Sequence, residues 1–334
     1  MTHTARNVLV LGLTFGVILA GLTGYNLYDT FVAEHEATAE YLLDSSSSSS
    51  TATSSSTTST SATSGDSSAS TSSSSSSASP YSTTAVSLLK KSATNSNGVT
   101  SKYYFADIKL HSYDDLKAHL TTSSNGSPGP NYTQTMTSHI SSVESAGETP
   151  LIAINGDSAY YSSYRAGYVI RNGLKYRSSS QNTSGKGTTS GDGFAIYKDG
   201  SAQSYLESST TTTALINSGC YHCFCFGPTL YENSAIQVGE DEDVYQCKGA
   251  NQRTAIGFID NYHFVFFVSE GRINGSSVDG FSLYEMAGLL RDYGCVRAYN
   301  LDGGGASYMW YGGSRVNTSS ENRAVGDILY VKAS

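Results

Sequence analysis

A carboxylate followed by three glycines is the segment of this chain best suited to chemistry. Asp302 ends a short apolar run that starts at Val296, and Gly303, Gly304 and Gly305 follow it. Because glycines have no side chains, a ligand could approach the main chain closely at this point. The alternative is an ordinary glycine turn that Asp302 caps, and for Asp-Gly-Gly taken alone the turn is the better interpretation.

A second carboxylate follows an earlier strand. The run His263–Val268 is continuously β-branched and aromatic, which is typical of a buried strand, and Glu270 follows it. Ser282 and Glu285 form a capping-box pattern that begins a helix between the two strands. The order strand, helix, strand predicts a βαβ unit with parallel strands, so Glu270 and Asp302 are expected at one sheet edge. Two neighbouring carboxyl groups could serve as proton donor and as base or nucleophile, as glycoside hydrolysis requires.

The remaining elements complete an α+β (or α/β) domain with a mixed sheet, in which the βαβ unit carries the site at the carboxyl ends of its strands. Turn chemistry at Asn172-Gly173 predicts a β-hairpin over 168–177. Apolar periodicity predicts a helix over Thr133–Ala146 and strands over Tyr103–Leu110, Leu151–Ile154, Gly191–Asp199 and Ala214–Ile216.

The first part of the 334-residue chain predicts a membrane anchor and a stalk. No charge occurs between Arg6 and Asp29, and at ~1.5 Å per residue the segment 8–28 could cross a hydrocarbon core of ~30 Å. The flanking charges place residues 1–7 in the cytoplasm and the rest outside the cell, with a cleaved signal peptide as the competing interpretation. Residues 29–80 would form the extracellular stalk. From Ser45 to Pro80, 29 of 36 residues are Ser or Thr, which predicts a disordered linker, and 81–334 remain for one domain.

The net charge and composition of the chain limit the kinds of ligand that it could bind. The formal net charge of -8 argues against nucleic-acid binding, and any bound phosphate must be held by a local group of arginines. The chain has 25 tyrosines and only 14% charged residues, which fits a surface protein that meets polar polymers. The oligomeric state does not follow from the sequence.

The cysteines and histidines favour structural roles. Disulfides are permitted outside the membrane, and one or two are expected among Cys220, Cys223, Cys225 and Cys247, for instance Cys225–Cys247. Their spacing, with His222 between them, matches no common zinc pattern. Cys295 is expected to be a packed hydrophobe, and His222 and His263 to be structural. No cofactor is expected, although Asp157 and Asp302 could hold a divalent cation such as calcium.

Several short motifs, taken in order, resemble those of the phosphodiester glycosidase family over roughly Tyr103 to Val331. These motifs are Ile154-Asn155-Gly156, Phe226-Gly227-Pro228, Arg253-Thr254-Ala255-Ile256-Gly257, Glu270-Gly271-Arg272, Gly280 with Ser282-Leu283-Tyr284-Glu285-Met286-Ala287, Asn300-Leu301-Asp302-Gly303-Gly304-Gly305-Ala306-Ser307 and Glu321-Asn322-Arg323-Ala324-Val325. The chain departs from the family pattern at three places. Glu270 replaces an expected Asp, Ala306 replaces a usual Ser, and Asp157 stands where an apolar residue or glycine is common.

The resemblance implies a hydrolase that cleaves a sugar-1-phosphate diester, and the predicted anchor would make it a membrane-anchored extracellular enzyme that acts on a surface glycan or exopolysaccharide. Asp302 and Glu270 would be catalytic, without an assignment of which is acid and which is base. The implied substrate-binding residues are Asn155, Asp157, Arg253, Arg272, Asn300, Gly303, Gly304, Ser307 and Arg323. Guanidinium groups suit a phosphodiester, but each arginine could instead pair with a nearby acid. The alternatives are a non-catalytic glycan-binding or adhesion protein and a protein that assembles exopolysaccharide.

Overall fold

The computed structural model describes residues 78–121, 132–156, 167–178, 192–242, 249–273, 276, 278–319 and 321–334. The predicted membrane span, most of the predicted stalk, Asp157 and Cys247 lie outside these residues. Within the described part, no helix has the length and apolar character needed to cross a membrane.

Three sheets build the domain, and every strand pairing among the described residues is antiparallel. The seven-stranded sheet has the order β1-β2-β13-β12-β14-β10-β11. Its strands are β1 (Ala85–Thr94), β2 (Thr100–Lys109), β13 (His263–Ser269), β12 (Thr254–Phe258), β14 (Arg297–Asn300), β10 (Thr229–Glu232) and β11 (Ala235–Ile236).

The other two sheets have five strands each and are named here after their β4 and β7 strands. The β4 sheet runs β16 (Ser314–Arg315), β15 (Met309–Tyr311), β4 (Pro150–Asn155), β17 (Asp327–Lys332) and β3 (Leu116–Leu120). The β7 sheet runs β6 (Leu174–Arg177), β5 (Val169–Arg171), β9 (Cys220–Phe224), β7 (Asp192–Tyr197) and β8 (Ala202–Leu206).

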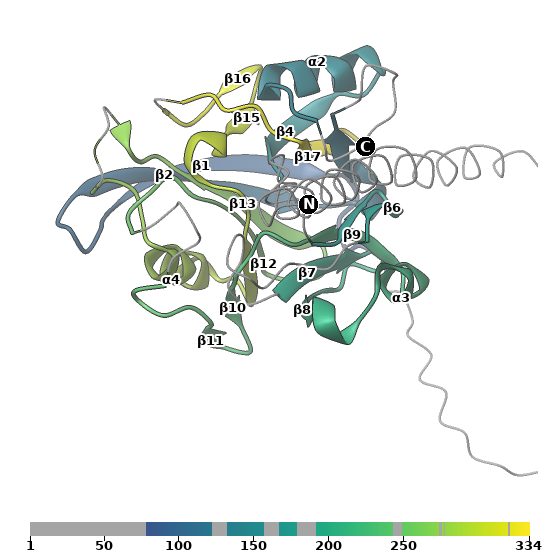
Figure 1. Cartoon of the computed structure of the whole chain (residues 1–334). Coiled ribbons are helices and arrows are strands. Elements are labelled where there is room, and N and C mark those ends of the chain that lie inside the picture. The colour runs from purple at the N-terminus through teal and green to yellow at the C-terminus, as the bar shows by residue number, and fades with distance from the viewer. Residues whose placement is uncertain are drawn as a thin grey trace, which may run out of the picture.

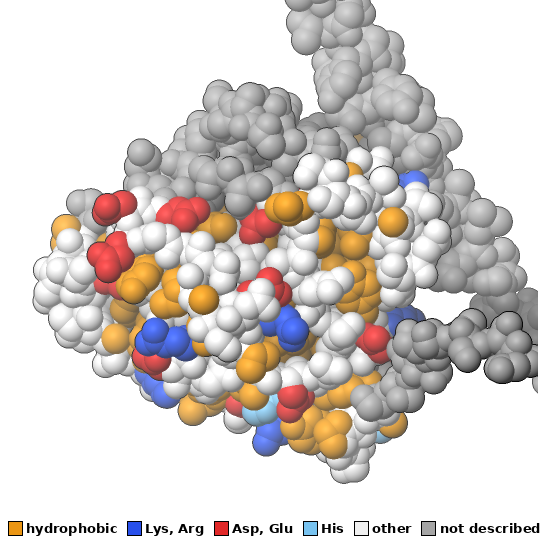
Figure 2. Space-filling view, turned by 90° about the horizontal axis from the view of Figure 1, so that it is seen from below, with side chains coloured by type: hydrophobic (Ala, Val, Ile, Leu, Met, Phe, Trp, Pro, Cys, Tyr) orange, Lys and Arg blue, Asp and Glu red, His pale blue; other side chains and the backbone are white. Residues whose placement is uncertain are grey.

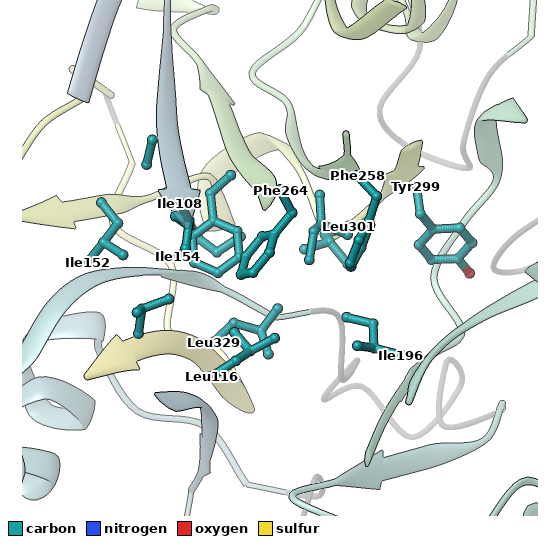
Figure 3. Close-up of a cluster of buried hydrophobic side chains, with 14 of the residues drawn as sticks. Ile108, Leu116, Ile152, Ile154, Ile196, Phe258, Phe264, Tyr299, Leu301 and Leu329 are labelled. Carbon is teal, nitrogen blue, oxygen red and sulfur yellow. The ribbon is translucent and has the colours of Figure 1, made fainter. Parts of the chain in front are cut away.

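One hydrophobic core is shared by all three sheets. Figure 3 shows Phe264 and Phe258 of the seven-stranded sheet, and Leu301 directly after β14, facing Leu116 and Leu329 of the β4 sheet, with Ile196 of the β7 sheet nearby. All of these side chains are 2% exposed or less, so the middle of the domain is dry and closely packed.

Three α-helices cover the outer faces of the sheets in the described residues (Figure 1). Helix α4 (Leu283–Tyr293) packs on the face of the seven-stranded sheet opposite the shared core. Helix α2 (Met136–Ser145) covers the β4 sheet, and α3 (Thr212–Asn217) covers the β7 sheet. Short 3-10 turns occur at Tyr113–Asp115, Glu207–Ser209 and Gly304–Ala306.

The predicted α+β (or α/β) class with a mixed sheet and a βαβ unit is wrong. The domain is mostly antiparallel β-sheet, and no βαβ unit is formed around α4. Strand β12 lies between β13 and β14 and pairs antiparallel with both. The sequence order strand, helix, strand could not reveal this, because the strand that fills the gap precedes all three elements in the chain.

Most predicted elements are confirmed, and one is wrong. Ser282 and Glu285 form both bonds of a capping box at α4, which also settles the structural role of Glu285. The hairpin turn has positive φ at Asn172 and Gly173, as predicted. The segment Ala214–Ile216 is helical, because the Thr211 side chain accepts a hydrogen bond from the Ala214 N–H and begins α3.

Both Lys and Arg and Asp and Glu lie among apolar atoms on the face of the domain shown in Figure 2. The exposed large apolar side chains of the described part are Leu206, Val278, Tyr284 and Val296. Single exposed apolar residues are ordinary on protein surfaces.

Candidate active site

The two predicted catalytic carboxylates stand at the same edge of the seven-stranded sheet. Because β12 is antiparallel to both neighbours, β13 and β14 run in the same direction and end at the same edge. Glu270 follows β13, and Asp302 follows β14. Neighbouring strands lie about 4.8 Å apart, so the two backbones are separated by roughly 10 Å with the start of β12 between them.

Asp302 forms an ion pair with Arg323. The Nη2 atom of Arg323 donates to Oδ1 and Oδ2 of Asp302 at 2.7 and 2.6 Å. The same atom also donates to the Gly303 carbonyl at 3.3 Å. The side chains of Arg323 and Asp302 are 33% and 15% exposed, so this pair is the accessible end of the site.

Glu270 is almost fully buried and is held through one oxygen. Its Oε1 atom accepts hydrogen bonds from the Tyr104 hydroxyl at 2.7 Å and from the Thr318 N–H at 3.1 Å. Burial, together with the hydrogen bond to Glu270, raises the pKa of Tyr104, so this hydroxyl stays protonated and remains a donor. No side chain or backbone donor in the described residues reaches Oε2 of Glu270, which leaves that atom for a ligand or water.

Asn155 positions the site from beneath. Its Nδ2 atom donates to the carbonyls of Gly156 and Asp302 at 3.0 and 2.7 Å. Its Oδ1 atom accepts from the Thr254 hydroxyl at 3.0 Å and from the Tyr308 N–H at 3.1 Å. The residue is fully buried and its amide is fully engaged, so Asn155 joins β4 to the Asp302 turn and does not offer a free group to substrate.

Arg253 lies on the other face of the sheet. Successive side chains of a strand alternate, and Arg253 points toward α4, where Nε donates to the Phe281 carbonyl at 2.9 Å and Nη2 to the Gly249 carbonyl at 2.6 Å. Arg253 is 1% exposed. The structure therefore does not bring its guanidinium group to Glu270 and Asp302. Arg272 is half-buried, directly after Gly271, with a left-handed backbone at φ 48°.

The glycine turn is a close contact between segments. Gly304 has φ 59°, which favours glycine, and its N–H donates to the Gln252 carbonyl at 3.0 Å. A side chain on Gly305 would collide with the Glu321 carboxylate. Gly303 and Gly304 thus bring the main chain against the segment that precedes β12, so the close approach observed here is between two segments of the protein, and the predicted approach of a ligand stays a prediction.

Asn300 and Ser307 are fully or almost fully buried. Asn300 donates from Nδ2 to the Gly227 carbonyl at 2.6 Å and so holds the Gly227-Pro228 segment against β14. The Ser307 carbonyl accepts from Arg315 Nη2 at 2.8 Å and from Asn317 Nδ2 at 3.0 Å. With its side chain enclosed, Ser307 is not placed as an exposed nucleophile.

Sequence reasoning missed three residues of the site: Gln252, Tyr104 and Thr318. Gln252 stands across from Glu270 in the β12–β13 pairing, because Thr254 pairs with Val268 and the register continues outward. The sequence contained a signal for the pairing of Gln252 with Glu270. The two strands of the β12–β13 hairpin are symmetric about Asn261, so counting outward from that turn pairs residue 252 with residue 270.

Metal and disulfide chemistry find little support in the described residues, which contain no group of three or more His, Cys, Asp or Glu side chains placed to hold a metal ion. Cys220 and Cys223 are buried thiols, and Cys225–Cys247 involves a cysteine outside the described part. Burial raises the pKa of Cys295 to about 12, as suits a packed thiol. Burial, reinforced by Arg171, lowers the pKa of His222 to about 3, and its Nε2 lies 3.2 Å from the Leu116 carbonyl, which confirms a structural role.

Comparison with known proteins identifies the family of proteins to which this chain is related. Residues 148–332 match the phosphodiester glycosidase family, and this stretch is more than half of the chain. The chain therefore belongs to the phosphodiester glycosidase family. The match includes both carboxylates, the glycine turn and Arg323, and this membership supports a hydrolase of that kind.

Individual relatives are distant. The SPbeta prophage-derived uncharacterized protein YomE of Bacillus subtilis is 27% identical over 183 residues, which are 54% of this chain and 28% of YomE. The chain thus spans less than a third of that relative's length. The catalytic domain of zebrafish N-acetylglucosamine-1-phosphodiester alpha-N-acetylglucosaminidase, auto-inhibited by its pro-peptide, aligns with a TM-score of 0.56 at 17% identity over 74% of this chain and 83% of that one. The crystal structure of a hypothetical protein from Synechocystis aligns with a TM-score of 0.53 at 12% identity, over 75% of this chain and 62% of that one. These two structures share the fold.

Proposed function

We propose that this protein hydrolyses a sugar-1-phosphate diester, with Glu270 and Asp302 acting at the shared edge of β13 and β14. The observation that carries this proposal is the Asp302–Arg323 pair at the same sheet edge as the buried Glu270 carboxylate, one oxygen of which has no donor among the described residues. A guanidinium group favours a phosphate, and a buried carboxylate with an available oxygen suits proton transfer in glycoside-type hydrolysis.

The proposed reaction breaks the bond between the anomeric carbon and the phosphate oxygen. The phosphate monoester leaves with the bonding electron pair, and Arg323 stabilises its charge. Water supplies the hydroxyl group at the anomeric carbon, and its proton passes to a carboxylate, for which Oε2 of Glu270 is the available atom. No metal ion or cofactor is part of this proposal.

The test is turnover of the methyl ester of N-acetylglucosamine-1-phosphate by the full-length chain, compared with Glu270→Gln and Asp302→Asn. Losing a catalytic proton-transfer group costs about 10²–10⁴-fold, so each variant should fall by at least that lower figure while circular dichroism stays unchanged. Reaction in ¹⁸O-water should place the label in the sugar. Label in the phosphate would contradict cleavage at the anomeric carbon.

Arg297→Gln is the matched control for Arg323→Gln. Arg297 pairs with Glu232 at 3.5 Å on β14 and its side chain is 41% exposed. Arg323→Gln should raise KM for the diester, and Arg297→Gln should not. If the wild type releases no sugar from a panel of diesters, with EDTA or with added Ca²⁺, Mg²⁺, Mn²⁺ or Zn²⁺, but still binds surface polysaccharide, the adhesion alternative replaces the enzyme.

We further propose that residues 8–28 anchor the protein in a membrane with the domain outside the cell, where a surface glycan or exopolysaccharide would be the substrate. The support is the uncharged segment between Arg6 and Asp29. Cell fractionation with protease added to intact cells tests this. Recovery of the full-length chain in the soluble fraction would contradict it.

A further inference from the structure

Gln252 has a buried amide group that is only half satisfied. It is 1% exposed, and its Nε2 donates to the Ser319 hydroxyl at 3.3 Å. Its Oε1 is buried without a hydrogen-bond partner among the described residues. Burying an amide oxygen without a hydrogen-bond partner is unfavourable, so such an atom in a native structure calls for a ligand or water to complete it.

The backbone beneath this amide is fixed on several sides. A side chain on Gly271 would lie 2.7 Å from the Gln252 nitrogen, and one on Gly280 would collide with the Asn251 carbonyl. Gly304 donates to the Gln252 carbonyl at 3.0 Å. Because glycines allow this close packing of backbone on backbone, the main chain of Gln252 is fixed, and its side chain starts from a defined position next to Glu270.

The position of the amide places it in the proposed active site. Gln252 is the cross-strand neighbour of Glu270 on one side and contacts the glycine turn after Asp302 on the other. Its side chain lies on the face toward the β4 sheet, as do Glu270 and Thr254, whereas Arg253 lies on the face toward α4. Exposure falls from the Arg323 side chain, at 33%, to Gln252, at 1%.

We propose that Gln252 is a sugar-recognition residue, whose Oε1 accepts a hydrogen bond from a ring hydroxyl or acetamido N–H of the substrate. This inference rests on the proposed function and gives the substrate an orientation. A carbonyl oxygen attracts a donor and repels phosphate oxygens, so the sugar lies toward Gln252 and Glu270. The phosphate and its aglycone lie toward the accessible Arg323, and the sugar that is released is therefore a terminal one.

The experiment is a double-mutant cycle with the full-length chain, in which residue 252 of the protein and single functional groups of the substrate are changed separately and together. The substrates are the methyl phosphodiester of N-acetylglucosamine and analogues that each lack one hydroxyl group or the acetamido group. The proteins are wild type, Gln252→Met, which keeps the side-chain length without the oxygen, and Gln252→Glu, which keeps an acceptor. In the wild type, one analogue should lose about tenfold in kcat/KM, because it leaves Oε1 unpartnered.

Gln252→Met should lose about the same factor on the parent diester and show no further loss on that analogue, whereas Gln252→Glu should keep the discrimination. Gln237→Met, at an exposed glutamine that bonds to its own hairpin, is the matched control and should behave as wild type. Equal losses for every analogue in wild type and Gln252→Met would overturn the proposal even when the enzyme is active.

If the wild type is inactive, the proposed function fails, and the Kd of each substrate analogue is measured by calorimetry for the same set of proteins. A loss of affinity confined to one analogue would support the contact between Gln252 and the sugar in a protein that is not an enzyme. Absence of binding, or equal losses throughout, would overturn both proposals. Melting temperatures of all variants exclude misfolding as the cause.

Discussion

Tyr104 fixes one oxygen of Glu270 and gives the first prediction at the scale of single residues. Replacing a donor to a charged acceptor removes about 1.5–3 kcal/mol, so Tyr104→Phe should lower kcat/KM on the diester roughly 10- to 100-fold. Steady-state kinetics with the full-length chain would measure this.

The matched control is Tyr113→Phe, because Tyr113 is also a buried tyrosine, but it donates to the Asn261 carbonyl at 2.5 Å, away from Glu270. Both substitutions should lower the melting temperature by similar small amounts. Equal activity of the two variants would show that the hydroxyl of Tyr104 has no part in the site.

The residues of the site divide according to what a strand pattern can reveal. Asp302 and Glu270 stood out because each follows an apolar run, and the structure places both at one edge. Arg253 stood out equally by type, yet strand alternation turns it to the opposite face. Gln252 has an unremarkable side chain, and only its register against Glu270 gives it importance. Residue type thus suggested chemistry, and the pairing of strands decided which residues meet.

At the scale of elements, two histidines join α2 to β3 and to the segment just before β17. His139 Nε2 lies 3.1 Å from the Val325 carbonyl, which can only accept, so Nε2 carries the proton. Its Nδ1 then accepts from Nδ1 of His119 at 2.8 Å, and both rings are neutral. Burial lowers the pKa of His139 to about 4 and also lowers that of His119.

These shifts predict a loss of stability in acid. A histidine whose pKa is lowered by folding stabilises the protein fully above its unfolded pKa of about 6.5, and this contribution disappears as the pH falls toward 4. At pH 5 the share of His139 should be smaller by roughly 2 kcal/mol than at pH 7.5. Urea unfolding across this range measures it.

His139→Gln should reduce the slope of the unfolding free energy against pH between 6.5 and 4. At pH 7.5, where the neutral ring is already present, the difference from wild type reports only the lost contacts. An unchanged slope would show that His139 titrates alike in the folded and unfolded chain.

Local signals fixed the helices better than the sheets. The capping box of α4 and its left-handed Gly294 lie within the helix's own sequence, so its ends could be predicted from nearby residues. The place of β12 between β13 and β14 depends on contacts between segments far apart in the chain. No local pattern distinguishes a strand that fills this gap from one that lies at the edge of the sheet.

At the scale of the whole molecule, a buried ion pair joins two sheets. Arg171 of β5 donates from Nε to Asp327 of β17 at 2.7 Å, and both side chains are at most 1% exposed. The guanidinium group also lies 4.4 Å from the ring centroid of Phe224, and Gly156 leaves no room beside the Asp327 carboxylate. A solvent-inaccessible ion pair therefore connects the β4 sheet to the β7 sheet.

Breaking this pair from one side should destabilise the domain strongly. Arg171→Met removes the guanidinium group that faces the buried Asp327 carboxylate, and breaking a buried ion pair from one side costs about 3–5 kcal/mol. For a domain of this size that corresponds to a fall in Tm of about 10 °C, measurable by differential scanning calorimetry. The double variant Arg171→Met with Asp327→Asn should recover part of the loss, because the uncompensated charge is removed with the arginine.

Lys198→Met, at the exposed pair with Asp114, is the control and should change stability by no more than about 1 kcal/mol. If the double variant is as unstable as the sum of the single ones, the two residues act independently and the pair does not join the sheets.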